Sequence, residues 1–175
     1  MSTMMTTVAG CKFCDIAAAK KKDEILKEKE KCIVVKDIKP KSKFHFLVIS
    51  KQHIPKPTDL TIADIPLIEQ MESAGREVLR KHLKKCGDAD TIEDMLRVGF
   101  HYPPMLNVHH LHMHFIYPIS EMGLISRKLT FRPGKVFKST RDVIENLRQS
   151  AGIADPLEDK HEGPEKISAH AIGLG

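Results

Sequence analysis

The stretch NVHHLHMHFIYP, residues 107–118, has four histidines in six consecutive positions. Side chains on a β-strand alternate between its two faces, so residues two apart lie on the same side. On a strand, His110, His112 and His114 therefore share one face, and the apolar residues between them share the other. Three neighbouring imidazoles titrate near neutral pH, and without a function they would cost stability in mild acid. The pattern favours a functional site over a structural role.

Two functional interpretations of this row are open, a catalytic zinc ion and direct chemistry on a phosphate. On a strand that rises about 3.3 Å per residue, the first and third histidines lie about 13 Å apart. They cannot share one ion at about 2.1 Å without severe distortion. An imidazole with one free nitrogen is also a nucleophile toward phosphorus when a hydrogen bond orients its other nitrogen. The row can therefore supply an attacking group, an orienting partner and a proton donor.

The rest of the chain predicts an α+β domain. Strands are expected at 31–40, 43–50, 93–100 and 107–118, with a further short strand at 127–131. Helices are expected at 11–24, at 61–85 with Thr61 or Asp64 as cap, and at 139–150 with Ser139 or Thr140 as cap. Strands mostly follow strands, which indicates a largely antiparallel sheet. We expect one domain over 11–149, a flexible N-terminus over 1–10 and a flexible tail over 150–175.

Composition limits the compartment and the class of partner. The four cysteines fit free thiols in a reducing compartment, so we expect the cytoplasm and also the nucleus. The N-terminus is a poor signal peptide, and no apolar run approaches 18 residues, so no membrane partner is expected. The formal charge of +5 favours an anionic partner such as a nucleotide or a nucleic acid, although an ordinary basic surface is equally compatible.

A pair of cysteines near the start has the spacing of a zinc site. Cys11 and Cys14 are separated by two residues, but one such pair supplies only two of four ligands. A redox role is less favoured because no strand precedes the pair. Two reduced thiols without an ion are the alternative.

Several segments together resemble the histidine triad superfamily. HLHMHFI matches the signature of alternating histidines, and CKFC, VVKDIKPKSKFHFLVISKQHI and LRVGFHYPPMLNVHHLHMHFIYP are similar to its nucleotide-binding, adenosine phosphoramidase branch. LRVGFHYPP also resembles the aprataxins, which remove AMP from DNA ends. The likeness spans 11–149. It implies an antiparallel sheet of about five strands, one long and one short helix, and a C-terminal helix.

The resemblance implies roles for five residues around a nucleotide. His112 would attack the α-phosphorus and form a covalent AMP-histidine, from which water releases AMP. His114 would lie near the phosphate and the leaving group. His45 matches a separate upstream histidine that helps to organise and protonate the site, and Asp37 and Ile38 match the ribose and base pocket.

The loop before the triad departs from the best-known members of the family. Gly99 stands where those members have an asparagine, and Met105, Leu106 and Asn107 replace a Gly-Gln-Ser lead. Asn107 can still donate an amide hydrogen bond to a phosphate oxygen. We expect these departures to affect the rate of the reaction and the preferred leaving group more than the type of reaction. The nucleotide-binding residues expected from the resemblance are Asp37, Ile38, Gly99, Met105, Leu106, Asn107, His112 and His114.

The resemblance also implies a structural zinc ion. In members with a similar cysteine pair, the positions of His53 and His110 complete the ligands of Cys11 and Cys14. The ion would join the N-terminal helix to the sheet, and catalysis itself would need no cofactor. His101 and His109 do not share the phase of the triad, so we expect them to be structural or exposed.

The implied function is hydrolysis of the P–N bond in adenosine 5'-phosphoramidates, including AMP-amines and AMP-lysine, by a homodimer. One alternative is an aprataxin-like DNA-adenylate hydrolase. It is less favoured because no cysteine follows Cys86 to build a C-terminal finger. The other alternative is a non-catalytic module that binds a nucleotide or a protein partner.

Overall fold

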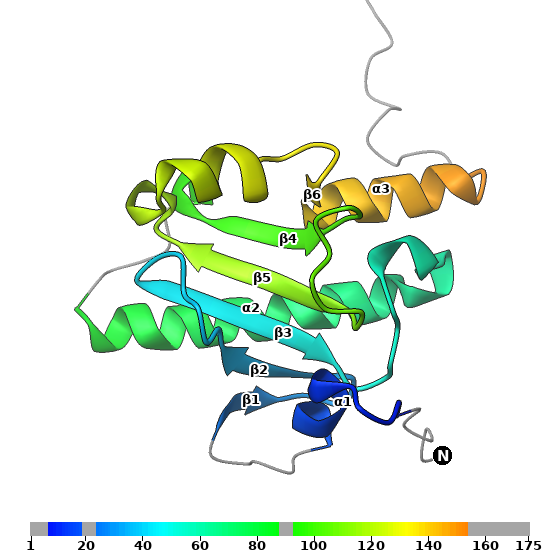
Figure 1. Ribbon diagram of the computed structural model, residues 1–175, viewed down its shortest axis with the longest axis horizontal. Helices are drawn as coiled ribbons and strands as arrows, with labels where there is room; N and C mark the ends of the chain where they lie inside the picture. Colours follow the sequence, from blue (N-terminus) through cyan, green and yellow to red (C-terminus); the bar gives the residue numbers. More distant parts are fainter. Residues whose placement is uncertain (1–6, 19–23, 88–92, 154–175) are drawn as a thin grey trace, which may run out of the picture.

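The fold is an antiparallel sheet with helices on both faces (Figure 1). The computed structural model describes residues 7–18, 24–87 and 93–153. Six strands are ordered β1-β2-β3-β5-β4-β6, and each runs antiparallel to its neighbours. They are β1 (Ile25–Glu28), β2 (Cys32–Lys36), β3 (Phe44–Ser50), β4 (Arg97–His101), β5 (His112–Tyr117) and β6 (Phe137–Lys138). The predicted α+β class is confirmed, with one strand more than the five expected.

The long helix α2 (Ile65–Lys85) packs behind the sheet and builds the main core (Figure 1). Its buried stripe meets the apolar face of β5, where Met113 and Phe115 are buried. Gly75 permits a close approach, because a Cβ there would lie 2.2 Å from the Phe115 ring. The apolar side of the histidine strand is thus fixed against α2, and the histidines face the other way. No helix in the described part of the chain is long and apolar enough to cross a membrane.

Two smaller clusters cover the ends of the opposite face and leave its middle to the histidines. Helix α1 (Lys12–Ala17) packs over β2 and β3, where Ala17 joins a buried cluster that includes Ile33 and Leu47. At the other end, Phe131 joins Ile116, Met122 and Phe137. The polar residues between the two clusters therefore have apolar walls on both sides.

The helix boundaries follow the capping signals in the sequence. Thr61 and Asp64 form a capping box around a short 3-10 turn, and α2 begins directly after it at Ile65. Ser139 caps α3 (Thr140–Ser150), because its hydroxyl accepts a hydrogen bond from the Asp142 N–H. Both helices thus lie close to their predicted ranges. The first helix is shorter than expected and ends at Ala17, and residues 19–23 lie outside the described residues.

One predicted strand is wrong, and two observed strands were not predicted. Residues 127–131 are not a strand: Ser126–Thr130 is a helical turn that carries Phe131 onto the sheet. Strands β1 and β6 were not predicted, since they are short and lack a clear alternating pattern. The expected flexible tail over 150–175 lies mostly outside the described residues, which end at Ile153.

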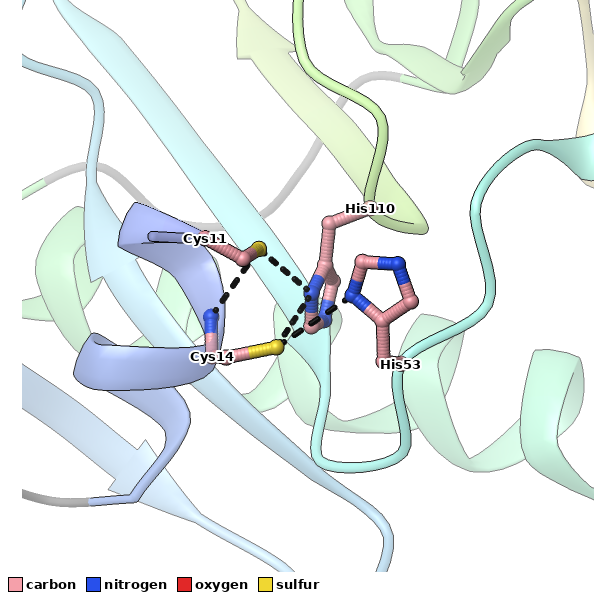
Figure 2. A group of neighbouring side chains, drawn as sticks. All are labelled: Cys11, Cys14, His53 and His110. Carbon is pink, nitrogen blue, oxygen red and sulfur yellow. Dashed lines mark hydrogen bonds between the residues drawn. The ribbon is translucent and has the colours of Figure 1, made fainter. Parts of the chain in front are cut away.

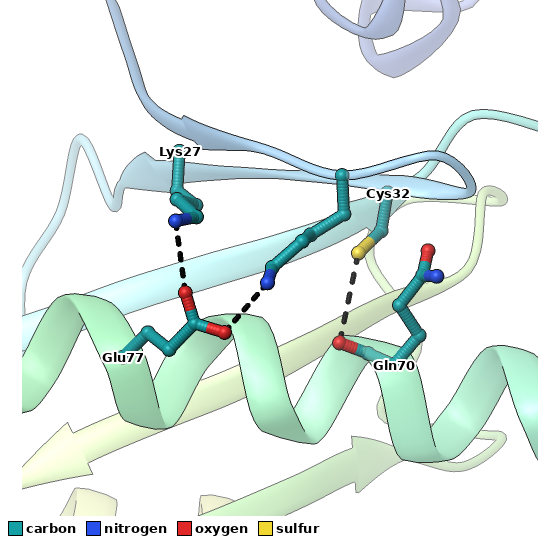
Figure 3. A network of polar contacts seen from close by, with 5 residues as sticks. Lys27, Cys32, Gln70 and Glu77 are labelled. Atoms are coloured by element: carbon teal, nitrogen blue, oxygen red, sulfur yellow. Dashed lines mark hydrogen bonds and ion pairs between the residues drawn. The ribbon is translucent and has the colours of Figure 1, made fainter.

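An ion-pair cluster attaches β1 to α2. The carboxylate of Glu77 lies 2.8 Å from the Lys27 amine and 2.6 Å from the Lys29 amine. Figure 3 shows this cluster beside Cys32, whose thiol lies 3.9 Å from the Gln70 carbonyl oxygen of the same helix. The Glu77 ion pairs fix the edge strand β1, and the Cys32 contact joins its neighbour β2 to the same helix.

Glu77→Gln should lower the free energy of unfolding by about 0.5 kcal/mol at pH 7, a small effect because the ion pairs are partly exposed. Hydrogen bonds from Lys27 and Lys29 lower the pKa of Glu77 to about 2. A lowered folded-state pKa stabilises the fold above the unfolded value of 4.5, and this contribution is lost as the pH falls toward 2. Urea unfolding at pH 7 and near pH 2 should show the difference from wild type only at pH 7. Glu69→Gln on the same helix is the control, and an equal Glu77→Gln effect at both pH values would contradict this account.

Candidate active site and metal centre

The triad histidines divide between two environments. His112 and His114 lie on β5 with ring centroids 5.0 Å apart, so these two share a face as predicted. His110 lies in the bend before β5, and its ring packs near His53, with centroids 5.0 Å apart. The strand was expected to begin before His110, but it begins at His112. The row therefore separates into a pair on the sheet and one histidine that faces α1.

His112 has the tautomer that a nucleophile needs. Its Nδ1 lies 2.7 Å from the backbone carbonyl oxygen of His110. A carbonyl oxygen only accepts hydrogen bonds, so Nδ1 carries the proton and Nε2 keeps a free lone pair. Phe13 of α1 packs edge-on against the His112 ring at 5.1 Å between centroids, which further fixes the ring.

A hydrogen-bonded chain sets the tautomers of His45 and His114. The Lys41 N–H donates to Nδ1 of His45 at 3.2 Å, so we assign the His45 proton to Nε2. That Nε2 donates to Nδ1 of His114 at 3.0 Å and lies 3.4 Å from a carboxylate oxygen of Asp37. His114 must then carry its own proton on Nε2, which is buried and has no hydrogen-bond partner among the described residues. His114 thus offers an N–H donor to whatever occupies the site.

Burial keeps these rings neutral at pH 7. It lowers the pKa of His45 to about 4, despite the opposing effect of the Asp37 carboxylate. It lowers the pKa of His112, and it places the pKa of His114 well below 6.5, with the neighbouring histidines adding to that shift. A neutral imidazole has the lone pair that nucleophilic attack requires, so the whole group is poised to react near neutral pH.

His101 joins the site, although it was expected to be structural or exposed. It is buried on β4, and its ring lies 4.7 Å from the His114 ring between centroids. Its Nδ1 has no hydrogen-bond partner among the described residues, and burial lowers its pKa to about 4. The sequence carries no signal for this position: Gly99 pairs with His114 across the sheet, and this pairing places His101, two residues further, on the histidine face. His109 is exposed, as expected.

Phe131 is a second residue that the sequence did not single out. Its ring contacts those of His45, His101 and His114, with centroids 5.9, 4.6 and 5.2 Å away. The helical turn at Ser126–Thr130 places it there, whereas a strand at 127–131 was expected. The ring excludes water from the histidines and so contributes to their low pKa values.

The residues expected to bind the nucleotide lie at different distances from this centre. Asp37 reaches it, and its other carboxylate oxygen accepts a hydrogen bond from the Lys39 N–H at 2.7 Å. Ile38 is 92% exposed, which leaves its side chain free to contact a ligand. The loop residues Met105 and Leu106 are half-buried, and Asn107 is exposed. None of the described contacts joins these three loop side chains to the histidines.

Close packing explains why position 99 is a glycine, and the sequence alone does not reveal this. A Cβ at this position would lie 2.1 Å from the Lys138 carbonyl oxygen of β6 and 2.9 Å from the Phe137 ring. Its φ of +157° is also rarely adopted by other residues. The departure from asparagine therefore allows β6 to approach β4 beside His114.

The second environment is a group of four potential metal ligands (Figure 2). Cys11 and Cys14 from α1 face His53, from the loop after β3, and His110. Nδ1 of His53 lies 3.2 Å from the Cys14 sulfur, and Nδ1 of His110 lies 3.4 Å from the Cys11 sulfur. All four ligand atoms lie within 4.8 Å of one another. The structure thus brings the predicted ligands together.

The hydrogen bonding of His110 fits a metal ligand. Its Nε2 donates to the Ser50 carbonyl oxygen at 2.8 Å, so Nδ1 keeps a lone pair directed at the two thiols. Such a second hydrogen bond commonly orients ligating histidines. Two sulfur and two imidazole ligands suit a tetrahedral structural site, so the group could bind a metal ion.

Asp37, His45 and His114 form another group with ligand atoms within 4.8 Å of one another, but they fit a metal poorly. A metal would need the lone pair of His45 Nε2. The Lys41 N–H already occupies Nδ1, so the single proton of a neutral His45 must sit on Nε2. The group is better explained as the hydrogen-bonded chain described above.

These features define a histidine triad protein: an antiparallel sheet carries the buried pair His112 and His114, and His45 from an earlier strand contacts His114. Residues 10–130 match the family model described as "Scavenger mRNA decapping enzyme C-term binding". "Adenosine 5'-monophosphoramidase HINT3" of Mus musculus is 36% identical over 144 residues, which cover 81% of this chain and 83% of that protein. The protein of the same name in Xenopus tropicalis is 33% identical over 141 residues, covering 80% and 88%.

Two more matches complete the comparison. The solved HIT family hydrolase from Clostridium thermocellum is 26% identical and superimposes with a TM-score of 0.52, covering 63% of this chain and 92% of that one. Aprataxin of Gallus gallus is 30% identical over 126 residues, which cover 71% of this chain and 37% of that protein. The chain therefore belongs to the family whose model matches residues 10–130, within the histidine triad superfamily, as its motifs predicted.

Proposed function

We propose that this chain is an adenosine 5'-monophosphoramidase, a hydrolase of the P–N bond between AMP and an amine. The observation that carries the proposal is the free Nε2 of His112, set by the hydrogen bond from Nδ1 to the His110 carbonyl oxygen. The relatives named for this activity in mouse and frog, which align over about four fifths of the chain, support it.

The proposed reaction has two steps. Nε2 of His112 attacks the α-phosphorus while the N–H of His114 donates a hydrogen bond to a phosphoryl oxygen; the P–N bond breaks, and the amine leaves neutral, because its nitrogen is already protonated in the bound phosphoramidate. Positive charge develops on the His112 ring, and the nearby Asp37 carboxylate favours that charge. Water then attacks the covalent AMP-histidine, loses a proton to the released amine or to solvent, and AMP leaves with the His112 lone pair restored.

In this proposal, the nucleotide binds at the end of β2 and the loop before β5. Asp37 accepts hydrogen bonds from the ribose hydroxyls, Ile38 contacts the base, and Asn107 donates to a phosphate oxygen. His101 lies beside His114, where its unpartnered Nδ1 can accept a hydrogen bond from a bound ligand. The homodimer and the cytoplasmic and nuclear location stay predictions.

Release of AMP from an AMP-amide tests the function, with an adenylated nicked DNA duplex assayed in parallel. The proposal expects turnover of the amide and little or none of the DNA. The aprataxin match and the LRVGFHYPP segment favour the DNA reaction as a second candidate. Turnover of DNA alone would establish that candidate, and tight AMP binding without any turnover would indicate a binding module.

We also propose that the four Cys and His ligands bind one structural zinc ion. The purified full-length chain should then contain one zinc per chain by elemental analysis, and Cys14→Ala should abolish retention because it removes a buried ligand. Asp37→Asn should keep the zinc, since Asp37 belongs to the group that fits a metal poorly. Loss of zinc in Asp37→Asn with retention in Cys14→Ala would place the ion at the other group.

A further inference from the structure

We propose that the metal centre positions the nucleophile, so that metal occupancy controls the catalytic rate of His112 more than the binding of substrate. The inference deepens the proposed function, on which its kinetic measurement rests. Two physical connections join the Cys and His ligands to His112, one through a backbone carbonyl and one through an aromatic ring.

The first connection is His110, which contacts both sites with different atoms. Its Nδ1 lies 3.4 and 3.5 Å from the two cysteine sulfurs, and its Nε2 donates to the Ser50 carbonyl oxygen. Its own carbonyl oxygen accepts the hydrogen bond from Nδ1 of His112 at 2.7 Å. That bond fixes the His112 proton on Nδ1, so the position of the His110 backbone relative to the His112 ring determines which nitrogen can attack.

The second connection is Phe13, which lies between the two cysteines in the six-residue helix α1. Its ring meets His112 edge-on at 5.1 Å and 84°, and it lies 6.0 Å from the His110 ring. A helix of this length has little stability of its own. Its placement depends on apolar packing, through residues such as Ile16 and Ala17, and on the two thiols that face the histidines.

The two connections have a common consequence. Without an ion, weak sulfur contacts of 3.2 to 3.5 Å join the thiols to the imidazoles, and the hydrogen bond from Nε2 to the Ser50 carbonyl oxygen holds the far side of the His110 ring. His110 and α1 then gain freedom, the hydrogen bond to His112 weakens, and part of the population adopts the other tautomer. Loss of such supporting contacts typically costs about 10- to 100-fold in activity. Asp37 directly follows β2 and His45 lies on β3, so both keep their contacts, and we expect substrate binding to change little.

The test compares the full-length chain with zinc bound, after removal of zinc by a chelator, and after zinc is restored. Long-range ¹H–¹⁵N spectra of the histidine rings report the tautomer of His112, assigned by the signal lost in His112→Ala. We expect a single Nδ1–H tautomer with zinc, a mixture without it, and recovery on restoration. We also expect kcat to fall about 10-fold without zinc while KM stays within about 2-fold.

The Phe13→Leu variant tests the second connection and keeps all four ligands. It still gives an answer if circular dichroism shows that the zinc-free chain is unfolded. With zinc bound, it should show a mixed His112 tautomer and a lower kcat. Lys12→Ala is the control on the same helix, because Lys12 is exposed and its replacement should leave the His112 signal unchanged.

The inference is overturned if His112 keeps one tautomer and the same kcat with and without zinc. If the zinc-free chain unfolds, it is overturned by a zinc-bound Phe13→Leu variant that has the single tautomer and the kcat of the zinc-bound wild type. A chain that turns over no phosphoramidate in any form contradicts the proposed function instead. In that case the His112 spectra alone still decide whether the metal centre sets the tautomer.

Discussion

Replacing His112 with alanine should reduce AMP release from an AMP-amide by about 10⁴-fold or more, because it removes the only route through a covalent intermediate. His112 lies on β5 with a free Nε2, and the neighbouring N–H of His114 cannot replace it as a nucleophile while it carries a proton. Steady-state kinetics with the amide measure the effect, and equilibrium binding of AMP should change far less than kcat.

His109→Ala is the control for His112→Ala. His109 is exposed one residue before His110 and lies outside the histidine pair on the sheet. Its replacement should leave both kcat and stability close to wild type. Retention of most of the activity in His112→Ala would show that another group attacks the phosphorus.

Replacing Gly99 with asparagine should destabilise the chain by about 3 kcal/mol. The substitution restores the residue that better-known family members have at this position, yet the fold here leaves no room for it. Its Cβ would lie 2.1 Å from the Lys138 carbonyl oxygen, and this backbone atom moves only if β6 separates from β4. The displaced β6 carries Phe137, which packs against His101, so activity should fall as well.

Urea unfolding measures the Gly99→Asn effect, with Gly123→Ala as the control. Nothing lies within 4 Å of a Cβ built on Gly123, so that substitution should change the free energy of unfolding little. A Gly99→Asn chain that is as stable as wild type would contradict the close approach of β6.

Strong local patterns made much of this fold predictable. The β-branched residues of 31–40 and the nearly continuous apolar run of 43–50 indicated strands, and β2 and β3 are both buried along nearly their whole length. The capping residues Thr61 and Ser139 marked the starts of the helical regions. Alternation along 107–118 correctly placed His112 and His114 on one face, opposite the core.

The features that the sequence missed depend on contacts between distant segments. β1 is held by the ion pairs of Glu77, and β6 by its pairing with β4, and neither leaves a periodic pattern. Residues 127–131 were expected to form a strand, but packing of Phe131 against the histidines favours a helical turn. His101 was missed because its relation to His114 appears only when β4 pairs with β5.

The candidate metal centre shows the limit of spacing arguments. The cysteine pair alone supplied two ligands, and only the family resemblance assigned His53 and His110 to complete them. The structure brings all four ligand atoms within 4.8 Å, because α1 folds onto the end of β3 and His110 leaves the strand before β5 begins. The separation of His110 from the other two triad histidines is thus a property of the loop conformation, which alternation alone does not predict.

Mass spectrometry of the chain quenched during turnover of an AMP-amide tests the central claim most directly. If His112 attacks phosphorus, the quenched chain should gain the mass of one adenylyl group, which is AMP less one water, and peptide mapping should place the adduct on His112. No adduct should form in His112→Ala. An adduct on any other residue, or turnover with no adduct under conditions that preserve a phosphohistidine, would contradict the account.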